Sequence, residues 1–343
     1  MNLKDKLIGE VLKKGRLSYA EAVELLLYDP THGYYRSGKP HYKDFLTSPE
    51  ISPIFGLAIG RYLGRLCAGL SLSRLSLLEL GGASGELAQA LISGASGVVV
   101  ERCVIVEKGE HARQGVIEWV DDLRAVALME GFTAVIANEF LDALPFHRIR
   151  CLEGELEEIR VGHGDGFFEE PGPLEPRVRS YLERFPLSLR EGQALEITPD
   201  LLDVAARLSA TVERGIFLVF DYGYHNADIA AGRFPDGSVA GYRDFMLVDD
   251  VLEEPGSADV THHVNFDHLS DMLTGQGWRK EGELPQYRFL FQAGILDALE
   301  SLPETQRLAA KSLIDPRGLG SVVTALAFTK GIDIRLPGFS RRQ

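Results

Sequence analysis

The sequence predicts an α/β protein with a mostly parallel, doubly wound sheet. From residue 75 onward, short apolar runs alternate with stretches of helical periodicity, as strands and helices do in such a sheet. The runs are too short for helices and are apolar on both faces, which is typical of buried parallel strands. The composition agrees, because 343 residues with 45% apolar and 25% charged side chains can form a substantial globular core.

The first 70 residues are expected to form a helical cover. Apolar residues recur at helical spacing over 3–12, and Ser18 with Glu21 forms a capping box ahead of the next helix. A further helix over 48–67 is indicated by a serine N-cap, a proline at the first helical position and an acidic first turn.

The sheet itself is expected within a core of residues 71–330, followed by a tail over 331–343. The predicted strands are 75–80, 103–106, 134–137, 194–197 and 216–220, with two late strands at 287–291 and 322–328 that finish the sheet as a mixed edge. Two segments interrupt the alternation, at 151–192 and 223–265. Both follow strands whose carboxyl ends should face a ligand crevice, so we expect them to form an inserted substrate lobe.

A glycine-rich turn follows the first strand, with the sequence Gly81-Gly82-Ala83-Ser84-Gly85-Glu86. Such a turn lets backbone amides and a helix N-terminus approach an anionic or polar ligand. The dinucleotide motif Gly-x-Gly-x-x-Gly fails, because its second and third glycines would fall on Ala83 and Glu86; a Walker loop fails for lack of Gly-Lys-Ser/Thr. Taken alone, the turn is equally compatible with a tight connection that binds nothing.

The remaining pattern, Glu-x-Gly-x-Ala-x-Gly over 79–85, resembles motif I of class I S-adenosylmethionine-dependent methyltransferases. Ordered segments along most of the chain resemble the MidA-like family, whose mitochondrial members are complex I assembly factors that methylate a protein arginine. These segments are 28–35, 44–52, 137–145, 221–224, 258–266 and the region of Arg288. The resemblance implies a Rossmann-like class I methyltransferase fold with a late antiparallel edge. It further implies S-adenosylmethionine as the cofactor and an arginine or other nitrogen of a partner protein as the methyl acceptor.

Carried over by position, the resemblance implies two sets of binding residues. The cofactor set is Asp44, Thr47, Glu79, Gly81, Gly82, Gly85, Glu107, Asp121 and Asn138. In it, Glu107 ends the second strand, where an acid would hold the ribose hydroxyls, and Asp121 would accept from the adenine amino group unless it is simply a solvated loop acid. The acceptor set is Tyr35, Glu50, Asp221, Tyr222, Tyr242 and His263. Glu50 also suits a first-turn helix position, and His263 would either contact the acceptor or brace the lobe.

Asn138, Glu139 and Asp142 are the predicted catalytic residues. If the chain turns helically after Asn138, the two carboxylates lie three residues apart and share a face. Together they could clamp a guanidinium through paired hydrogen bonds and accept the released proton. The alternative is that both acids cap the following turn.

Several positions depart from the family pattern. Ala83, Ser84 and Glu86 replace residues of its glycine turn, and Lys43 and Asn265 replace a glycine and an aspartate. If φ at Ala83 is positive, its Cβ brings strain. Two alternatives therefore stay open: a catalytically weakened methyltransferase fold that acts by binding a partner, and an enzyme that methylates a small molecule.

Charge and composition exclude other classes. With 50 acidic against 36 basic residues, the net charge of −14 disfavours nucleic acid and anionic membranes and is compatible with a basic, arginine-bearing partner. No apolar run is long enough to span a bilayer, and three separated cysteines without a Cys/His cluster predict neither disulfides nor a metal site. The N-terminal segment resembles no signal or transit peptide. We therefore expect a cytoplasmic protein; its oligomeric state is not indicated.

Overall fold

The computed structural model describes residues 2–36, 44, 46–108, 115–300 and 303–339. They form two compact units, each assembled from three stretches of chain. We call residues 47–141, 204–222 and 270–343 the sheet unit, and residues 1–46, 142–203 and 223–269 the companion unit. Both insertions noted in the sequence fall within stretches of the companion unit.

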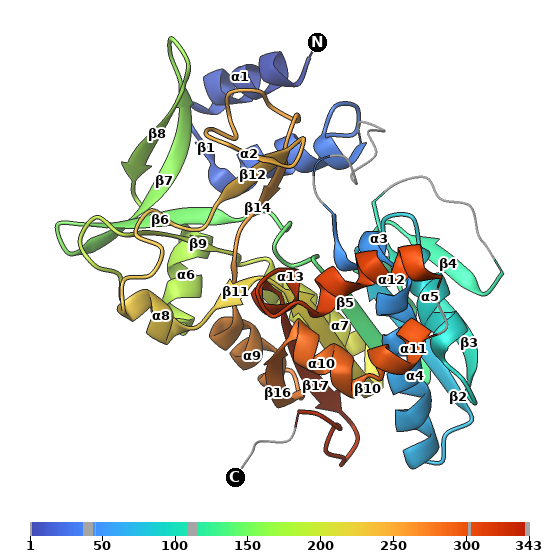
Figure 1. Cartoon of the computed structure of the whole chain (residues 1–343). Coiled ribbons are helices and arrows are strands. Elements are labelled where there is room, and N and C mark those ends of the chain that lie inside the picture. The colour runs from blue at the N-terminus through green and yellow to red at the C-terminus, as the bar shows by residue number, and fades with distance from the viewer. Residues whose placement is uncertain (1, 37–43, 45, 109–114, 301–302, 340–343) are drawn as a thin grey trace. The chain divides into compact units, whose positions relative to one another are not determined.

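The sheet unit is built on a seven-stranded sheet of order β16-β17-β10-β5-β2-β3-β4 (Figure 1). Its strands are β2 (Arg74–Leu80), β3 (Val99–Val106), β4 (Ile117–Val120), β5 (Met129–Asn138), β10 (Val212–Asp221), β16 (Arg279–Pro285) and β17 (Thr324–Lys330). From β4 to β10 all neighbouring strands are parallel, whereas β17 is antiparallel to both β10 and β16. The predicted mostly parallel sheet with a late antiparallel strand is thus confirmed.

Side chains on both faces of this sheet are buried. Successive residues of β2, such as Leu77 and Leu78, are 1% and 0% exposed, as expected for a parallel sheet covered on both sides. One face packs into a core with α4, α5, α10 and α11. The helices of this unit are α3 (Ser48–Ile51), α4 (Ile54–Gly69), α5 (Glu86–Gly94), η3 (Leu123–Ala125), α10 (Gln286–Gln292), α11 (Ile295–Glu300), α12 (Glu304–Lys311), η4 (Ser312–Ile314) and α13 (Leu319–Val322); α7 (Leu201–Thr211) and α9 (Phe266–Thr274) have residues in both units.

The companion unit contains three small sheets. In the largest, β1 (Leu17–Ser18), β7 (Glu155–His163), β6 (His147–Leu152) and β9 (Ala194–Ile197) lie in that order, and β8 (Phe167–Gly172) also pairs with β7. The others join β13 (Met246–Val248), β12 (Ala240–Arg243) and β14 (Asp259–Thr261), and β11 (Gly223–Tyr224) with β15 (Val264–Asn265). Its helices are α1 (Leu3–Lys14), α2 (Tyr19–Tyr28), η1 (Tyr34–Arg36), α6 (Pro176–Arg184) and α8 (Asn226–Ala230). Residues of α1, α2 and the largest sheet share one apolar core.

Three local predictions are corrected by the structure. Residues 287–291 form helix α10 rather than a strand, because Gln286, Phe289 and Leu290 are buried at helical spacing; the strand beside β17 is β16. The expected helix over 48–67 is broken between α3 and α4, since Pro53 disfavours helical backbone at the residue before it. Residues 194–197 do form a strand, but an antiparallel one in the companion unit.

No helix among the described residues is both long and apolar enough to cross a membrane.

Candidate functional site

The glycine turn connects β2 to α5 at the carboxyl end of the parallel strands. Gly81 and Gly85 have φ of +73° and +78°, in the left-handed region that favours glycine. A Cβ on Gly82 would lie 2.3 Å from Ile105 Cγ2, so close packing against β3 requires glycine here. Ala83 has a φ of +41° and therefore carries backbone strain.

Acidic residues stand at or just beyond the ends of β2, β3 and β4. Glu107 Oε2 accepts a hydrogen bond from the Ala83 N–H at 3.0 Å, which holds this carboxylate beside the turn. Glu79 is buried, and this burial together with the negative charge of Glu107 raises its pKa to about 8. Within the described residues Glu79 Oε2 has no hydrogen-bond partner. Asp121 is exposed directly after β4.

Asn138 and Glu139 lie at the end of β5, next to the turn in the parallel register. Asn138 Nδ2 donates to Glu139 Oε1 at 3.1 Å, and Asn138 Oδ1 has no partner in the described part of the chain. Glu139 has a φ of +48°, unusual for a residue with a side chain. Although the residue as a whole is partly exposed, its carboxyl group is enclosed by protein, and this burial raises its pKa to about 8.

Ser48 and Gln286 complete the surroundings of Glu139, and sequence reasoning did not identify either as a site residue. The Ser48 N–H donates to Glu139 Oε1 at 3.3 Å, and Ser48 Oγ donates to Gln286 Oε1 at 3.1 Å. Both residues are fully buried, and Gln286 Nε2 is without a partner among described residues. Ser48 was recognisable as the start of a helix, where N–H groups are free, although Thr47 rather than Ser48 is the N-cap. A single glutamine just before the presumed strand at 287–291 carried no signal.

Thr47 and Glu50 form a capping box at α3. The N–H and Oγ1 of Thr47 donate to Glu50 Oε2 at 2.9 and 3.0 Å. Burial, with a smaller contribution from the negative charge of Glu86, raises the pKa of Glu50. The local role of Glu50 is therefore the first-turn helix position that its sequence context also allowed.

Asp221 and Tyr222 end β10 beside the same loop. Asp221 is fully buried and accepts from the N–H groups of Leu141 and Tyr222 at 3.0 and 2.9 Å, so its carboxylate organises the backbone. Tyr222 Oη donates to Glu139 Oε2 at 3.3 Å. The Glu139 carboxylate thus receives hydrogen bonds from Ser48, Asn138 and Tyr222.

The helical alignment of Glu139 with Asp142 is wrong. Residues 139–146 form bends and turns, because the left-handed conformation of Glu139 stops helical continuation. Asp142 belongs to the companion unit, where its carbonyl accepts from the His262 N–H at 3.0 Å and from His262 Nδ1–H at 2.8 Å. His262 Nε2 in turn accepts from Thr198 Oγ1, and burial lowers the pKa of His262 to about 3, so the ring is neutral.

Tyr35 and Tyr242 of the companion unit lie near Asp142. Tyr35 Oη donates to Asp259 Oδ1 at 2.6 Å. Burial is the main cause of the raised pKa of both tyrosines, and the negative charges of Asp259 and Asp142 add to it.

Asp44 makes its hydrogen bonds within the companion unit. Its Oδ2 accepts from Tyr34 Oη, and its Oδ1 accepts from the Asp244 N–H. Lys43 lies outside the described residues.

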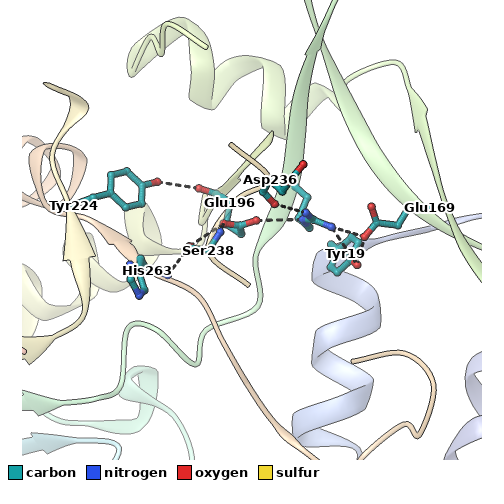
Figure 2. Close-up of polar contacts among 8 residues, drawn as sticks. Tyr19, Glu169, Glu196, Tyr224, Asp236, Ser238 and His263 are labelled. Carbon is teal, nitrogen blue, oxygen red and sulfur yellow. Dashed lines mark hydrogen bonds and ion pairs between the residues drawn. The ribbon is translucent and has the colours of Figure 1, made fainter. Parts of the chain in front are cut away.

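His263 is part of a buried polar network in the companion unit. Figure 2 shows its N–H directed at Ser238 Oγ, which donates to Glu196. Glu196 also accepts from Arg148 Nε at 3.1 Å. Burial lowers the pKa of His263 to about 4 and keeps it neutral. The contacts of its backbone favour the bracing role among the two that the sequence left open.

The sheet unit therefore places hydrogen-bond acceptors around the glycine turn. Glu107, Glu79 Oε2 and Asn138 Oδ1 offer oxygen atoms to hydroxyl or amino groups, while the turn excludes side chains at its glycines. The enclosed Glu139 carboxylate, at the end of the adjacent strand, matches a cationic group.

Comparison with known proteins identifies the family. A family model described as "Putative S-adenosyl-L-methionine-dependent methyltransferase" matches residues 58–284. The protein arginine methyltransferase NDUFAF7 homolog of Drosophila melanogaster is 27% identical over 387 residues, covering 96% of this chain and 85% of its own length. The human protein arginine methyltransferase NDUFAF7 is 27% identical over 342 residues, covering 84% and 72%. A protein of Burkholderia thailandensis, solved bound to S-adenosyl-homocysteine, superposes with a TM-score of 0.86 at 25% identity, covering 99% and 94%.

These curated relatives are named as mitochondrial proteins, which contradicts the expectation of a cytoplasmic protein. The family model spans more than half of the 343 residues, and the similarity to the Burkholderia structure extends over nearly all of them. The chain therefore belongs to the S-adenosyl-L-methionine-dependent methyltransferase family, with S-adenosylmethionine as its cofactor.

Proposed function

We propose that this methyltransferase methylates an arginine side chain of a partner protein, and that Glu139 holds the acceptor guanidinium. The observation that carries the proposal is the enclosed Glu139 carboxyl group, whose burial raises its pKa to about 8. The names of the curated relatives, which are protein arginine methyltransferases, support the same acceptor class.

Among the described residues, no cationic side chain forms an ion pair with Glu139, in keeping with the raised pKa of its enclosed carboxyl group. A guanidinium stays charged at any physiological pH, and its planar fork of N–H donors matches the two oxygens of a carboxylate. Its arrival would favour the ionised form of Glu139 and lower the pKa of that group. The hydrogen bonds from Ser48, Asn138 and Tyr222 would keep the carboxylate oriented, which is the main requirement of a transfer that depends on alignment.

The residues around the glycine turn fit S-adenosylmethionine, which supplies a methyl group on a sulfonium centre. Glu107 would accept from the ribose hydroxyls, as an acid at the end of the second strand does in related folds. Asn138 Oδ1 and Glu79 Oε2 have no partners among the described residues and would accept from the cofactor's amino group. Gly81, Gly82 and Gly85 would shape the turn, because a Cβ at any of them would lie within 3 Å of Phe140, Ile105 or Trp119. Thr47 and Asp121 are further proposed members of the cofactor set, whereas Asp44 braces its own unit.

Asp142, Tyr35 and Tyr242 are our proposed acceptor-side residues in the companion unit. The negative charge of Asp142 acts on both tyrosines, so the three form one local group. A carboxylate flanked by phenol groups suits a basic peptide. His262 positions this group by holding the Asp142 carbonyl.

The test is transfer of labelled methyl from S-adenosylmethionine to arginine-bearing proteins, with methylarginine identified after hydrolysis. Glu139→Gln should lower turnover by about a hundredfold or more, because the charge that holds the guanidinium is removed, while cofactor affinity stays near that of the wild type. Glu101→Gln, an exposed carboxylate of β3, is the matched control and should behave as wild type. Undiminished methylarginine formation by Glu139→Gln would remove Glu139 from the reaction, and label recovered only in small molecules would refute the protein acceptor.

A further inference from the structure

The β12–β13 hairpin exposes three consecutive large apolar side chains. Phe245, Met246 and Leu247, which we call the hairpin tip, are 60%, 69% and 67% exposed. The other exposed large apolar residues in the described part of the chain occur singly in the sequence. Scattered apolar residues are normal on a surface, but a contiguous exposed run is characteristic of an interaction site.

The turn of this hairpin is held in a conformation that its sequence does not favour. Asp244 and Phe245 have φ of +51° and +61°, the left-handed pair of a type I′ turn, in which glycine is preferred at the second position. The Asp244 N–H donates to Asp44 Oδ1 at 2.9 Å, and the Phe245 N–H donates to the Asp44 carbonyl at 3.1 Å. A bulky residue here is unfavourable for the turn itself, so the phenyl ring has to be explained by what it contacts outside the hairpin.

The surface around the hairpin tip is strongly acidic. A cavity of about 210 Å³ is lined by Met246 and Leu247 and by the acids Asp249, Asp250, Glu253 and Glu254, which we call the acidic rim. Over residues 240–259 there are six acids, Asp244, Asp249, Asp250, Glu253, Glu254 and Asp259, against the single base Arg243, a net charge of −5. Arg243 is already paired with Glu254. Lys4 Nζ also lies at the rim, where it donates to the Glu253 carbonyl at 3.3 Å. Apolar side chains beside acids that outnumber the nearby bases fit a partner that is both apolar and basic.

We propose that the hairpin tip and the acidic rim dock the methyl-acceptor protein through a basic segment that also carries an apolar side chain. The inference rests on the proposed function, since a protein acceptor is what brings such a segment to this enzyme. The apolar side chains would pack on the hairpin tip, and arginine or lysine side chains would meet the acidic rim. Anchoring by Asp44 keeps the tip in its binding conformation before the partner arrives, which lowers the entropic cost of association.

The test is binding of labelled synthetic peptides to the full-length protein, followed by fluorescence anisotropy. The probe alternates arginine, leucine and glycine; one comparison peptide replaces leucine by serine and another replaces arginine by glutamate. We expect the arginine–leucine peptide to bind more tightly than either, with an affinity that falls as salt is raised. Phe245→Gly with Leu247→Ser should weaken it by about tenfold, and Asp249→Asn with Glu253→Gln should reduce its salt dependence.

Matched variants separate docking from folding. Leu12→Ser, an isolated apolar residue that is 70% exposed, and Glu183→Gln, an exposed acid of α6, should bind the peptide as the wild type does. Phe245→Gly alone should weaken binding without lowering the unfolding midpoint, because glycine relieves the left-handed strain. If Phe245 only stabilised the fold, Phe245→Gly would instead lower the unfolding midpoint and leave peptide binding unchanged.

Three results would overturn the proposal: no binding of the arginine–leucine peptide at micromolar concentration, equal binding by the hairpin variants, or loss of self-association as the only effect of Phe245→Gly. The last would assign the tip to a second copy of the chain. Hairpin-dependent binding without methylarginine formation on any arginine substrate would refute the proposed function and leave the docking surface standing. Methylarginine formation with hairpin-independent binding would refute the docking surface alone.

Discussion

Replacing Glu139 with glutamine should change the pH dependence of stability in a predictable direction. Its pKa is about 8 in the folded protein against an ordinary value of 4.5. Between these values the folded chain holds a proton that the unfolded chain has released, so the free energy of unfolding falls as pH rises through this window. Glutamine does not titrate, and its amide oxygen can keep the hydrogen bonds from Ser48 and Asn138. The bond with Tyr222 would reverse direction, because the Tyr222 hydroxyl can accept from the glutamine NH₂ group.

The size of the effect follows from the pKa shift. Each unit corresponds to about 1.4 kcal/mol, so the difference between Glu139→Gln and the wild type should grow by up to that amount per pH unit between about pH 4.5 and 8. Near pH 5 the two proteins should be about equally stable. Above pH 8 the variant should be more stable by about 3–5 kcal/mol.

The assay is urea unfolding at several pH values, followed by tryptophan fluorescence. The chain has two tryptophans, Trp119 and Trp278, and both belong to the sheet unit that contains Glu139, so the signal reports on the relevant part of the fold. The pKa of Glu79 is also raised to about 8, so Glu79 adds to the pH dependence of stability as well. Its contribution is the same in the variant and the wild type and cancels when the two are compared. Glu101→Gln is the exposed control. A stability difference that does not vary with pH, or a variant that is less stable above pH 8, would refute the reasoning.

Three further predictions concern the glycine turn and the buried network. Ala83→Gly should raise the free energy of unfolding by about 0.5–1 kcal/mol in thermal or urea unfolding, because relief of strain exceeds the added flexibility of the unfolded chain; a decrease would contradict the strained turn. Glu107→Gln should weaken S-adenosylmethionine binding by about tenfold or more in calorimetry, since a charged hydrogen-bond acceptor is lost; an unchanged Kd would exclude Glu107 from the cofactor site. Gly237→Ala should destabilise the protein by about 3 kcal/mol or more in urea unfolding, because φ is +86° and the new Cβ would lie 2.2 Å from the buried Glu196 Oε1; wild-type stability would show that the network tolerates displacement.

Local sequence signals predicted much of the sheet unit. The apolar runs at 75–80, 103–106, 134–137 and 216–220 all lie within parallel strands, and the turn after the first of them is left-handed as its glycines suggest. The capping box of Ser18 with Glu21 is present as well. These features depend on residues close in sequence, so spacing and residue type suffice to predict them.

Predictions failed where neighbouring residues supported two conformations. The run at 287–291 has the length and apolar character of a strand, yet packing selects the helix that buries Phe289 and Leu290. The spacing of Glu139 and Asp142 suggested a shared helical face, but Glu139 is itself left-handed, and this ends any helix before Asp142. Short segments have no strong preference of their own, and tertiary contacts decide between the alternatives.

By itself, the sequence determined the family, the strand and turn that shape the cofactor site, and the acidic residue types available there. Only the tertiary structure decided which of those acids is enclosed. Ser48, Tyr222 and Gln286 come from distant parts of the chain to surround Glu139 and its loop, and their packing removes water from the carboxyl group. Desolvation depends on every atom around a group, whatever its distance in sequence, so the raised pKa of Glu139 could not be deduced from the order of residues.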